Sequence, residues 1–139
     1  MRQRIDPAFE YDPGPVLWGA VVVFGLGLVV NFVLGRPLWL VLVALVGGGV
    51  AASRCGFYDV SANNGALAVV VGTLALLPFL SFRRTTWFPI EGTGDTLFYV
   101  VVFVLSWLPM VVIVLAPIGY VAGIVVDNLR RRLDSPLGY

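Results

Sequence analysis

The sequence has no lysine and no histidine, and it has a single cysteine, Cys55, in 139 residues. One cysteine cannot form a disulfide within the chain, and no cluster of histidine and cysteine is present to bind a metal. Without histidine the chain also lacks the most common haem ligand and the usual proton shuttle. We therefore expect no metal, haem or other cofactor.

Charged residues are scarce as well. They make up 12% of the chain, against 59% hydrophobic residues, and the formal net charge is +1. This balance provides no basic field for binding nucleic acid. The mean hydropathy is +0.94, and the apolar residues come in long blocks rather than alternating with polar ones. A soluble core cannot absorb four such blocks in so short a chain, so the pattern indicates membrane spans.

The four blocks predict an all-α integral membrane protein with four transmembrane helices, the last of them long and kinked by proline. The chain is expected to divide into an exposed N-terminal tail at 1–15, a transmembrane domain at 16–126 with spans near 16–34, 38–56, 65–82 and 96–126, and a basic C-terminal tail at 127–139.

Two of the predicted spans have unusual lengths. The second is strictly apolar only to Ala52, which is about 22 Å of helix; either Arg54 snorkels and the helix continues toward Tyr58, which we favour, or the helix is short. The last span is too long for one upright crossing and too short for two. We expect one tilted or protruding helix that bends at Pro109 and Pro117, with a re-entrant hairpin near Pro117 as the alternative.

Small residues recur at four-residue spacing in three places. The pairs are Gly48 with Ala52, Ala68 with Gly72, and Gly119 with Gly123. Such pairs clear one face of a helix, so that backbones can approach and gain dispersion contacts. They serve either as a face for dimerisation or for packing inside the bundle, and we favour packing within the chain.

The linker between the second and third spans is the most polar internal point of the central hairpin. Arg54 and Asp59 are placed to form an ion pair there, and Ser61 or Asn63 is placed to cap the third helix by accepting its free N–H groups. A lone cysteine beside an arginine, as Cys55 is, is usually inert. We therefore interpret these residues as an interfacial pair and a helix cap rather than as a catalytic site.

Arginine positions predict the orientation. With four spans, the N-terminus, the central linker and the C-terminal tail share one side. That side carries Arg2, Arg4, Arg54, Arg130, Arg131 and Arg132, and the other side carries Arg36, Arg83 and Arg84. The positive-inside rule then places both termini in the cytoplasm. The three successive arginines are expected to act as a topology anchor, with binding of anionic headgroups as the alternative.

No catalytic constellation is visible. All acidic residues fall in tails, loops or helix ends, which disfavours an ion-coupled transporter acting alone. Ser106 has no histidine or lysine to activate it, so we expect a hydroxyl that bonds back to its own helix. Asn31 is expected to form an interfacial or inter-helix hydrogen bond rather than a ligand contact. A surface enzyme using Asp59, Glu91 or Asp95 has no specific support.

The segment Gly47–Ala52, the pair Tyr58 and Asp59, and the segment Asn64–Ala68 together resemble a group of small haloarchaeal membrane proteins of unknown function. That group combines a glycine-rich second span, an aspartate in a short linker, and a polar residue followed by glycine at the start of the third span. Val60 departs from the pattern, because glycine is usual there. The resemblance implies a four-helix architecture and an archaeal source, and it implies no activity.

These observations favour a multi-pass protein of the cell membrane with a structural or partner-binding role. Its expected partners are the lipid bilayer and either further copies of itself or another membrane protein, with no nucleic acid. The alternative is a subunit of a channel or transporter whose pathway requires oligomerisation or other chains. No enzymatic activity is expected.

Overall fold

Every regular element that the computed structural model describes, in residues 11–54, 60–85 and 93–134, is a helix, which confirms the predicted all-helical class for these residues. In chain order the elements are α1 (Pro13–Leu28), a π-helical turn η1 (Val29–Val33), a 3-10 turn η2 (Pro37–Trp39), α2 (Leu40–Ser53), α3 (Ser61–Thr85), α4 (Thr93–Met110), a second π-helical turn η4 (Val111–Leu115) and α5 (Ala116–Asp134).

The first helix begins where the sequence supplies both a cap and a proline. The Asp12 carboxylate accepts the backbone N–H of Gly14 at 3.3 Å, and a proline occupies the start of the helix, where an N–H would have no partner. The helix therefore begins inside the predicted tail; residues 1–10 of that tail lie outside the described residues. Gly35, with a φ of 63°, reverses the chain after η1.

The second helix is shorter than predicted. α2 has 14 residues and ends at Ser53, with Arg54 as its C-cap, rather than continuing through Arg54 toward Tyr58. Residues 55–59 lie outside the part of the chain that the structure describes. At 1.5 Å per residue α2 is about 21 Å long. Three helices are long and apolar enough to cross a membrane, Pro13–Val33, Ser61–Ser81 and Gly94–Asp134, and α2 falls below that length.

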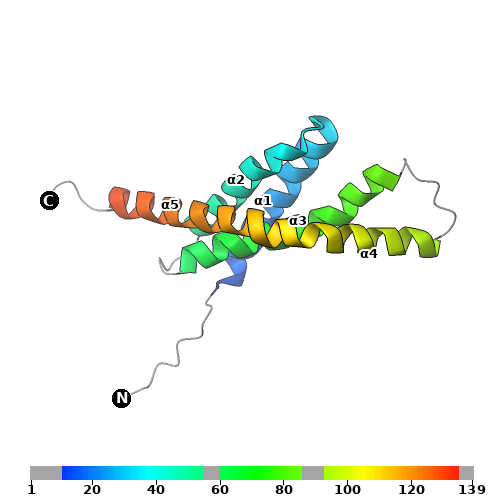
Figure 1. Ribbon diagram of the computed structural model, residues 1–139. Coiled ribbons are helices and arrows are strands. Elements are labelled where there is room, and N and C mark those ends of the chain that lie inside the picture. The colour runs from blue at the N-terminus through cyan, green and yellow to red at the C-terminus, as the bar shows by residue number, and fades with distance from the viewer. Residues whose placement is uncertain (1–10, 55–59, 86–92, 135–139) are drawn as a thin grey trace, which may run out of the picture.

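The last apolar run forms one continuous helix. α4, η4 and α5 join as Gly94–Asp134, which has 41 residues and appears as a single rod in Figure 1. The helix passes through Pro117 without reversing, so the chain does not re-enter there. It also extends through the predicted tail of 127–139 as far as Asp134. An ion pair between Asp127 Oδ2 and Arg131 Nη2, at 3.0 Å and four residues apart, stabilises this extension.

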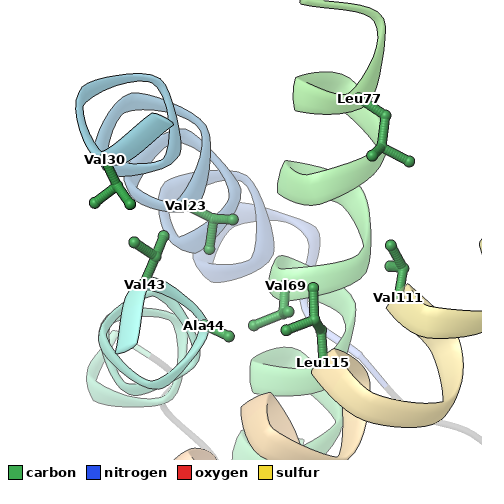
Figure 2. Close-up of a cluster of buried hydrophobic side chains, with 8 residues drawn as sticks. All are labelled: Val23, Val30, Val43, Ala44, Val69, Leu77, Val111 and Leu115. Atoms are coloured by element: carbon green, nitrogen blue, oxygen red, sulfur yellow. The ribbon is translucent and has the colours of Figure 1, made fainter. Parts of the chain in front are cut away.

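Four helices, α1, α2, α3 and α5, pack together, while α4 packs on α3. Figure 1 shows α1 and α2 as a hairpin that the α4–α5 rod crosses at an angle. The core lies between these helices, and Figure 2 shows its members: Val23, Val30, Val43, Ala44, Val69, Leu77, Val111 and Leu115. Phe24 of α1 and Phe79 of α3 extend it through an edge-to-face contact, with ring centroids 5.3 Å apart.

The outer surface of the helices is apolar as well. Leu97, Phe98 and Leu105 on α4 are each more than half exposed, as are several large apolar residues of α1 and of α5. In water so large an apolar surface would drive association. In a bilayer it needs no protein partner, because lipid tails are as apolar as leucine.

The buried and exposed leucines should therefore differ in their effect on stability. We expect Leu77→Ala, at 2% exposure in the core, to lower the free energy of unfolding by about 2 kcal/mol, because it leaves a cavity that neighbouring helices cannot fill. Leu105→Ala, at a site 60% exposed, is the matched control and should change stability by less than about 0.5 kcal/mol. Unfolding by SDS in mixed micelles measures both, and equal losses would contradict the assignment of the core.

Candidate functional site

One end of the bundle brings together polar side chains from all four packed helices. The backbone N–H of Asp12 donates to Oδ1 of Asn64 at 2.8 Å, which joins the start of α1 to the start of α3. Nη1 of Arg130 donates to the carbonyl oxygen of Ala52 at 3.2 Å, which joins α5 to the end of α2. We call this region, defined by Asp12, Arg54, Asn64, Asp127 and Arg130, the polar end.

Two arginines complete the C-terminus of α2. The Ala52 carbonyl that accepts the Arg130 side chain also accepts the backbone N–H of Arg54. The Arg54 guanidinium lies over the ring of Trp18, 4.4 Å from its centroid. Positive charge is favourable here because the last carbonyls of a helix carry a partial negative charge, and the indole face adds a cation–π attraction. Both α1 and α5 are thereby attached to the end of α2.

Asp127 is the one acidic residue that is buried among the described residues, at 8% exposure. Its Oδ2 pairs with Arg131, whereas its Oδ1 has no hydrogen-bond partner within the described ranges. It follows Gly123 by one helical turn, and a Cβ on Gly123 would lie 2.6 Å from the Ser61 carbonyl oxygen. Asp127 therefore lies near the start of α3, where the partial positive charge of a helix N-terminus favours a carboxylate.

Asn64 is the second incompletely bonded group. Its side chain is fully buried, and while Oδ1 accepts the Asp12 N–H, Nδ2 has no partner in the described part of the chain. A buried donor left unpaired costs roughly 1–3 kcal/mol. The described residues contain no group of three or more histidine, cysteine, aspartate or glutamate side chains that could hold a metal. The polar end thus offers hydrogen-bonding capacity without a metal-ligand set.

Next to the polar end, three helices touch through glycine. We call Gly48 of α2, Gly65 of α3 and Gly119 of α5 the glycine crossing. A Cβ on Gly48 would lie 2.8 Å from the Gly119 carbonyl oxygen, and one on Gly119 would lie 2.6 Å from the Gly65 carbonyl oxygen. The Gly119 carbonyl oxygen also occupies the space that a Cβ on Gly65 would need. No side chain fits between these backbones.

The first helix approaches the bundle in the same way. A Cβ on Gly19 would lie 2.7 Å from the Gly47 carbonyl oxygen and 2.7 Å from the Cβ of Ala68. On α3, a Cβ on Gly72 would lie 2.7 Å from the Ala20 carbonyl oxygen. Small residues therefore line the contacts of α1 with both α2 and α3.

The small residues that the sequence singled out lie at these contacts: Gly48 and Gly119 in the glycine crossing, Gly123 against the start of α3, Gly72 against α1, and Ala52 and Ala68 fully buried. The three pairs singled out leave out Gly19, Gly47 and Gly65, although Gly47 is four residues before Ala51 and Gly65 is four residues after Ser61. For Gly65, the sequence signal of a close helix contact is a glycine that directly follows a polar residue, Asn64, at the start of a span.

Of the predicted linker residues, Arg54 lies over the Trp18 ring, and Asn63 is the third residue of α3 and so lies inside the helix rather than before it. Asp59 lies outside the described residues, so its ion pair with Arg54 stays a prediction. The three successive arginines diverge: Arg130 binds the Ala52 carbonyl, Arg131 binds Asp127, and Arg132 is exposed.

The two polar side chains expected within spans bond to their own helices. Ser106 Oγ donates to the Val102 carbonyl at 2.7 Å, which confirms the predicted back-bonding. Asn31 Nδ2 donates to the Gly27 carbonyl at 2.8 Å, so this donor bonds within its helix rather than across helices or at the interface. In an apolar environment the carbonyl four residues earlier is the nearest acceptor that such a side chain can reach.

No protein-family model, no curated protein and no solved structure matches this chain. The resemblance to haloarchaeal membrane proteins therefore stays a prediction.

The glycine crossing should not tolerate a methyl group. We expect Gly65→Ala to lower the free energy of unfolding by about 1–3 kcal/mol, because the added carbon would overlap the Gly119 carbonyl. Gly25→Ala is the matched control, since its Cβ would meet nothing within 4 Å, and it should be neutral or stabilising because alanine favours helix. Unfolding in mixed micelles compares the two. A Gly65→Ala protein as stable as the Gly25→Ala protein would contradict the close approach.

The packing of α2 on α5 can be tested by crosslinking. A Cβ on Gly49 would lie 3.3 Å from Cγ2 of Val126, which is compatible with a disulfide. In a Cys55→Ser background we expect Gly49→Cys with Val126→Cys to oxidise to an intramolecular disulfide, detected by mass after alkylation. The control pair, Gly49→Cys with Val125→Cys, should stay reduced because Val125 is exposed on another face. Equal crosslinking of both pairs would show that α2 and α5 are not held in this register.

Proposed function

We propose that this chain is a four-span integral protein of the cell membrane with a structural or partner-binding role, α2 being the shorter fourth crossing. The observation that carries the proposal is the connectivity at the polar end. α1 and η1 lead away from that end over Pro13–Val33, which is about 31 Å. α2 returns to it, because its last turn binds Arg130. A chain that leaves and returns in this way crosses the same layer twice.

The length of the last span supports a tilt and a bend. Gly94–Asp134 has 41 residues, roughly 60 Å of helix, against a hydrocarbon layer of about 30 Å. A long helix adapts to a thin layer by tilting, kinking or protruding. Pro109 and Pro117 remove backbone hydrogen bonds on either side of the π-helical turn η4, so we place the bend of this span between them.

Orientation follows from the arginines. The polar end carries Arg54 and Arg130–Arg132, and by the positive-inside rule it lies in the cytoplasm together with both termini. Arg130, Arg131 and Arg132 then anchor this topology.

The described interior of the bundle supports a structural role better than a water-filled pathway for a transported substrate. The core is filled by aliphatic side chains, and the Asn31 amide and the Ser106 hydroxyl donate their hydrogen bonds to their own helices. A water-filled path would need such groups to face a shared channel. We therefore propose that the protein acts through contact with lipid and with further copies of itself or another membrane protein; copurification from native membrane would identify such a partner.

Four spans and a cytoplasmic polar end predict opposite labelling at the two ends. In a Cys55→Ser background, Leu38→Cys in the turn between α1 and α2 should react with an impermeant thiol reagent on intact cells. Asp134→Cys, at the end of α5, should react only after permeabilisation. Both positions are exposed in the described structure. Labelling of both from the same side would contradict an even number of spans.

Water access separates the structural role from a channel or transporter subunit. Thr73 faces the core at 2% exposure, while Val71, on the same helix, is 42% exposed on its outer side. In a bilayer we expect neither Thr73→Cys nor Val71→Cys to react with a charged thiol reagent, whereas Asp134→Cys reacts. Selective reaction of Thr73→Cys would instead indicate an aqueous pathway and would overturn the structural role.

A further inference from the structure

The C-terminal part of α5 combines an apolar stripe with arginine. Val121, Val125, Leu129 and Leu133 follow one another at four-residue spacing on α5 and are exposed by 53%, 50%, 54% and 82%. The stripe begins inside the apolar run and continues past Asp127. Leu129 and Leu133 therefore extend the lipid-facing surface of the span into its charged end, without a break in the helix.

The three arginines of this segment point in different directions, because successive residues of a helix are about 100° apart. Arg130 points inward to the Ala52 carbonyl, and Arg131 pairs with Asp127. Arg132 is exposed and lies seven residues after Val125, two turns along the same side of the helix. Its guanidinium is thus on the outer side, beside the stripe.

Contacts with α1 and α2 fix the position of the C-terminal end of α5 along the axis of the bundle. Arg130 is bonded to the carbonyl that also ends α2, next to Arg54 and Trp18. Tryptophan and arginine together are typical of the membrane interface. Leu133 is three residues beyond Arg130, at most about 4.5 Å further along the helix axis. A headgroup layer of about 5–8 Å accommodates this distance at any tilt.

We propose that the last two turns of α5 lie in the headgroup layer of the adjoining leaflet, with Arg132 and Arg54 bound to phosphates of anionic phospholipids and Leu129 and Leu133 against the upper acyl chains. The proposal rests on the membrane role proposed above. Charge complementarity favours anionic lipid, because the described residues at this end carry Arg54, Arg130, Arg131 and Arg132 against Asp12, Asp127 and Asp134, and Asp127 is paired with Arg131.

The depth of Leu133 tests the placement. In full-length protein carrying Cys55→Ser, a spin label is attached at Leu133→Cys or at Ile113→Cys, a mid-span position 71% exposed, in nanodiscs of phosphatidylcholine and phosphatidylglycerol. We expect oxygen to relax both labels more than a nickel chelate does, with a shallower depth at 133.

The outcomes of this measurement separate the two proposals. A label at 133 that is relaxed mainly by the nickel chelate, while the label at 113 is relaxed by oxygen, overturns only the placement of α5. Nickel relaxation at both positions overturns the membrane role as well. Dipolar coupling between 133 labels of two molecules would show that a second copy, not lipid, covers the stripe, and would also overturn the inference.

The choice of lipid is tested by native mass spectrometry of protein extracted from the same mixture. We expect Arg132→Gln and Arg54→Gln each to lower the retained ratio of phosphatidylglycerol to phosphatidylcholine about five-fold, the effect of one arginine near an anionic surface. Asn128→Gln, a neutral and exposed position on α5, is the matched control and should leave the ratio unchanged. An unchanged ratio in the first two variants, or an equal fall in all three, would overturn the proposed headgroup contact.

Discussion

Where α2, α3 and α5 cross, the carbonyl oxygen of Gly119 takes the place that a Cβ on Gly65 would need. Backbones this close gain dispersion contacts along their whole length of approach, and in lipid such contacts replace the hydrophobic gain that drives packing in water. The rest of the bundle depends on this approach, because it brings the end of α2 and the start of α3 within reach of α5. Without it Arg130 would not reach the Ala52 carbonyl.

The contacts at the polar end depend on this close approach of the helices, and they match the direction in which each helix runs. Antiparallel α3 and α5 place a carboxylate, Asp127, near a helix N-terminus, while parallel α2 and α5 place a guanidinium, Arg130, on a helix C-terminus. Both placements match the partial charges of helix ends. The cost is incomplete bonding at Asn64 Nδ2 and Asp127 Oδ1, which have no partner in the described residues.

The distribution of small and large apolar residues between helix contacts and outer surface indicates the environment to which the protein is suited. Small residues of the four packed helices lie at the helix contacts beside a core of valine and leucine, and further large aliphatic side chains cover the outer surface, as along α4 and the stripe of α5. Such an arrangement is suited to lipid, since the bilayer rewards close backbone packing and tolerates exposed leucine. It leaves charge at one end of α5, where contact with headgroups or with a partner protein is available.

The sequence by itself determined the all-helical class, the glycine turn at Gly35, the apolar lengths of three helices, and the back-bonded hydroxyl of Ser106, because each depends on local composition or on residues within one turn. It also located several small residues that lie at helix contacts. Only the tertiary structure decided which glycines meet, since Gly19, Gly47 and Gly65 find their partners on other helices. It also decided that α2 ends at Ser53 and that α5 continues past Asp127, because Arg54 contacts Trp18 of α1 and Arg130 of α5 binds the Ala52 carbonyl of α2. The apolar run that begins at Leu38 and the glycines after it can be recognised from the sequence alone. The Arg54 side chain, in contrast, contacts the ring of Trp18, 36 residues away in the sequence, and no local pattern predicts that contact.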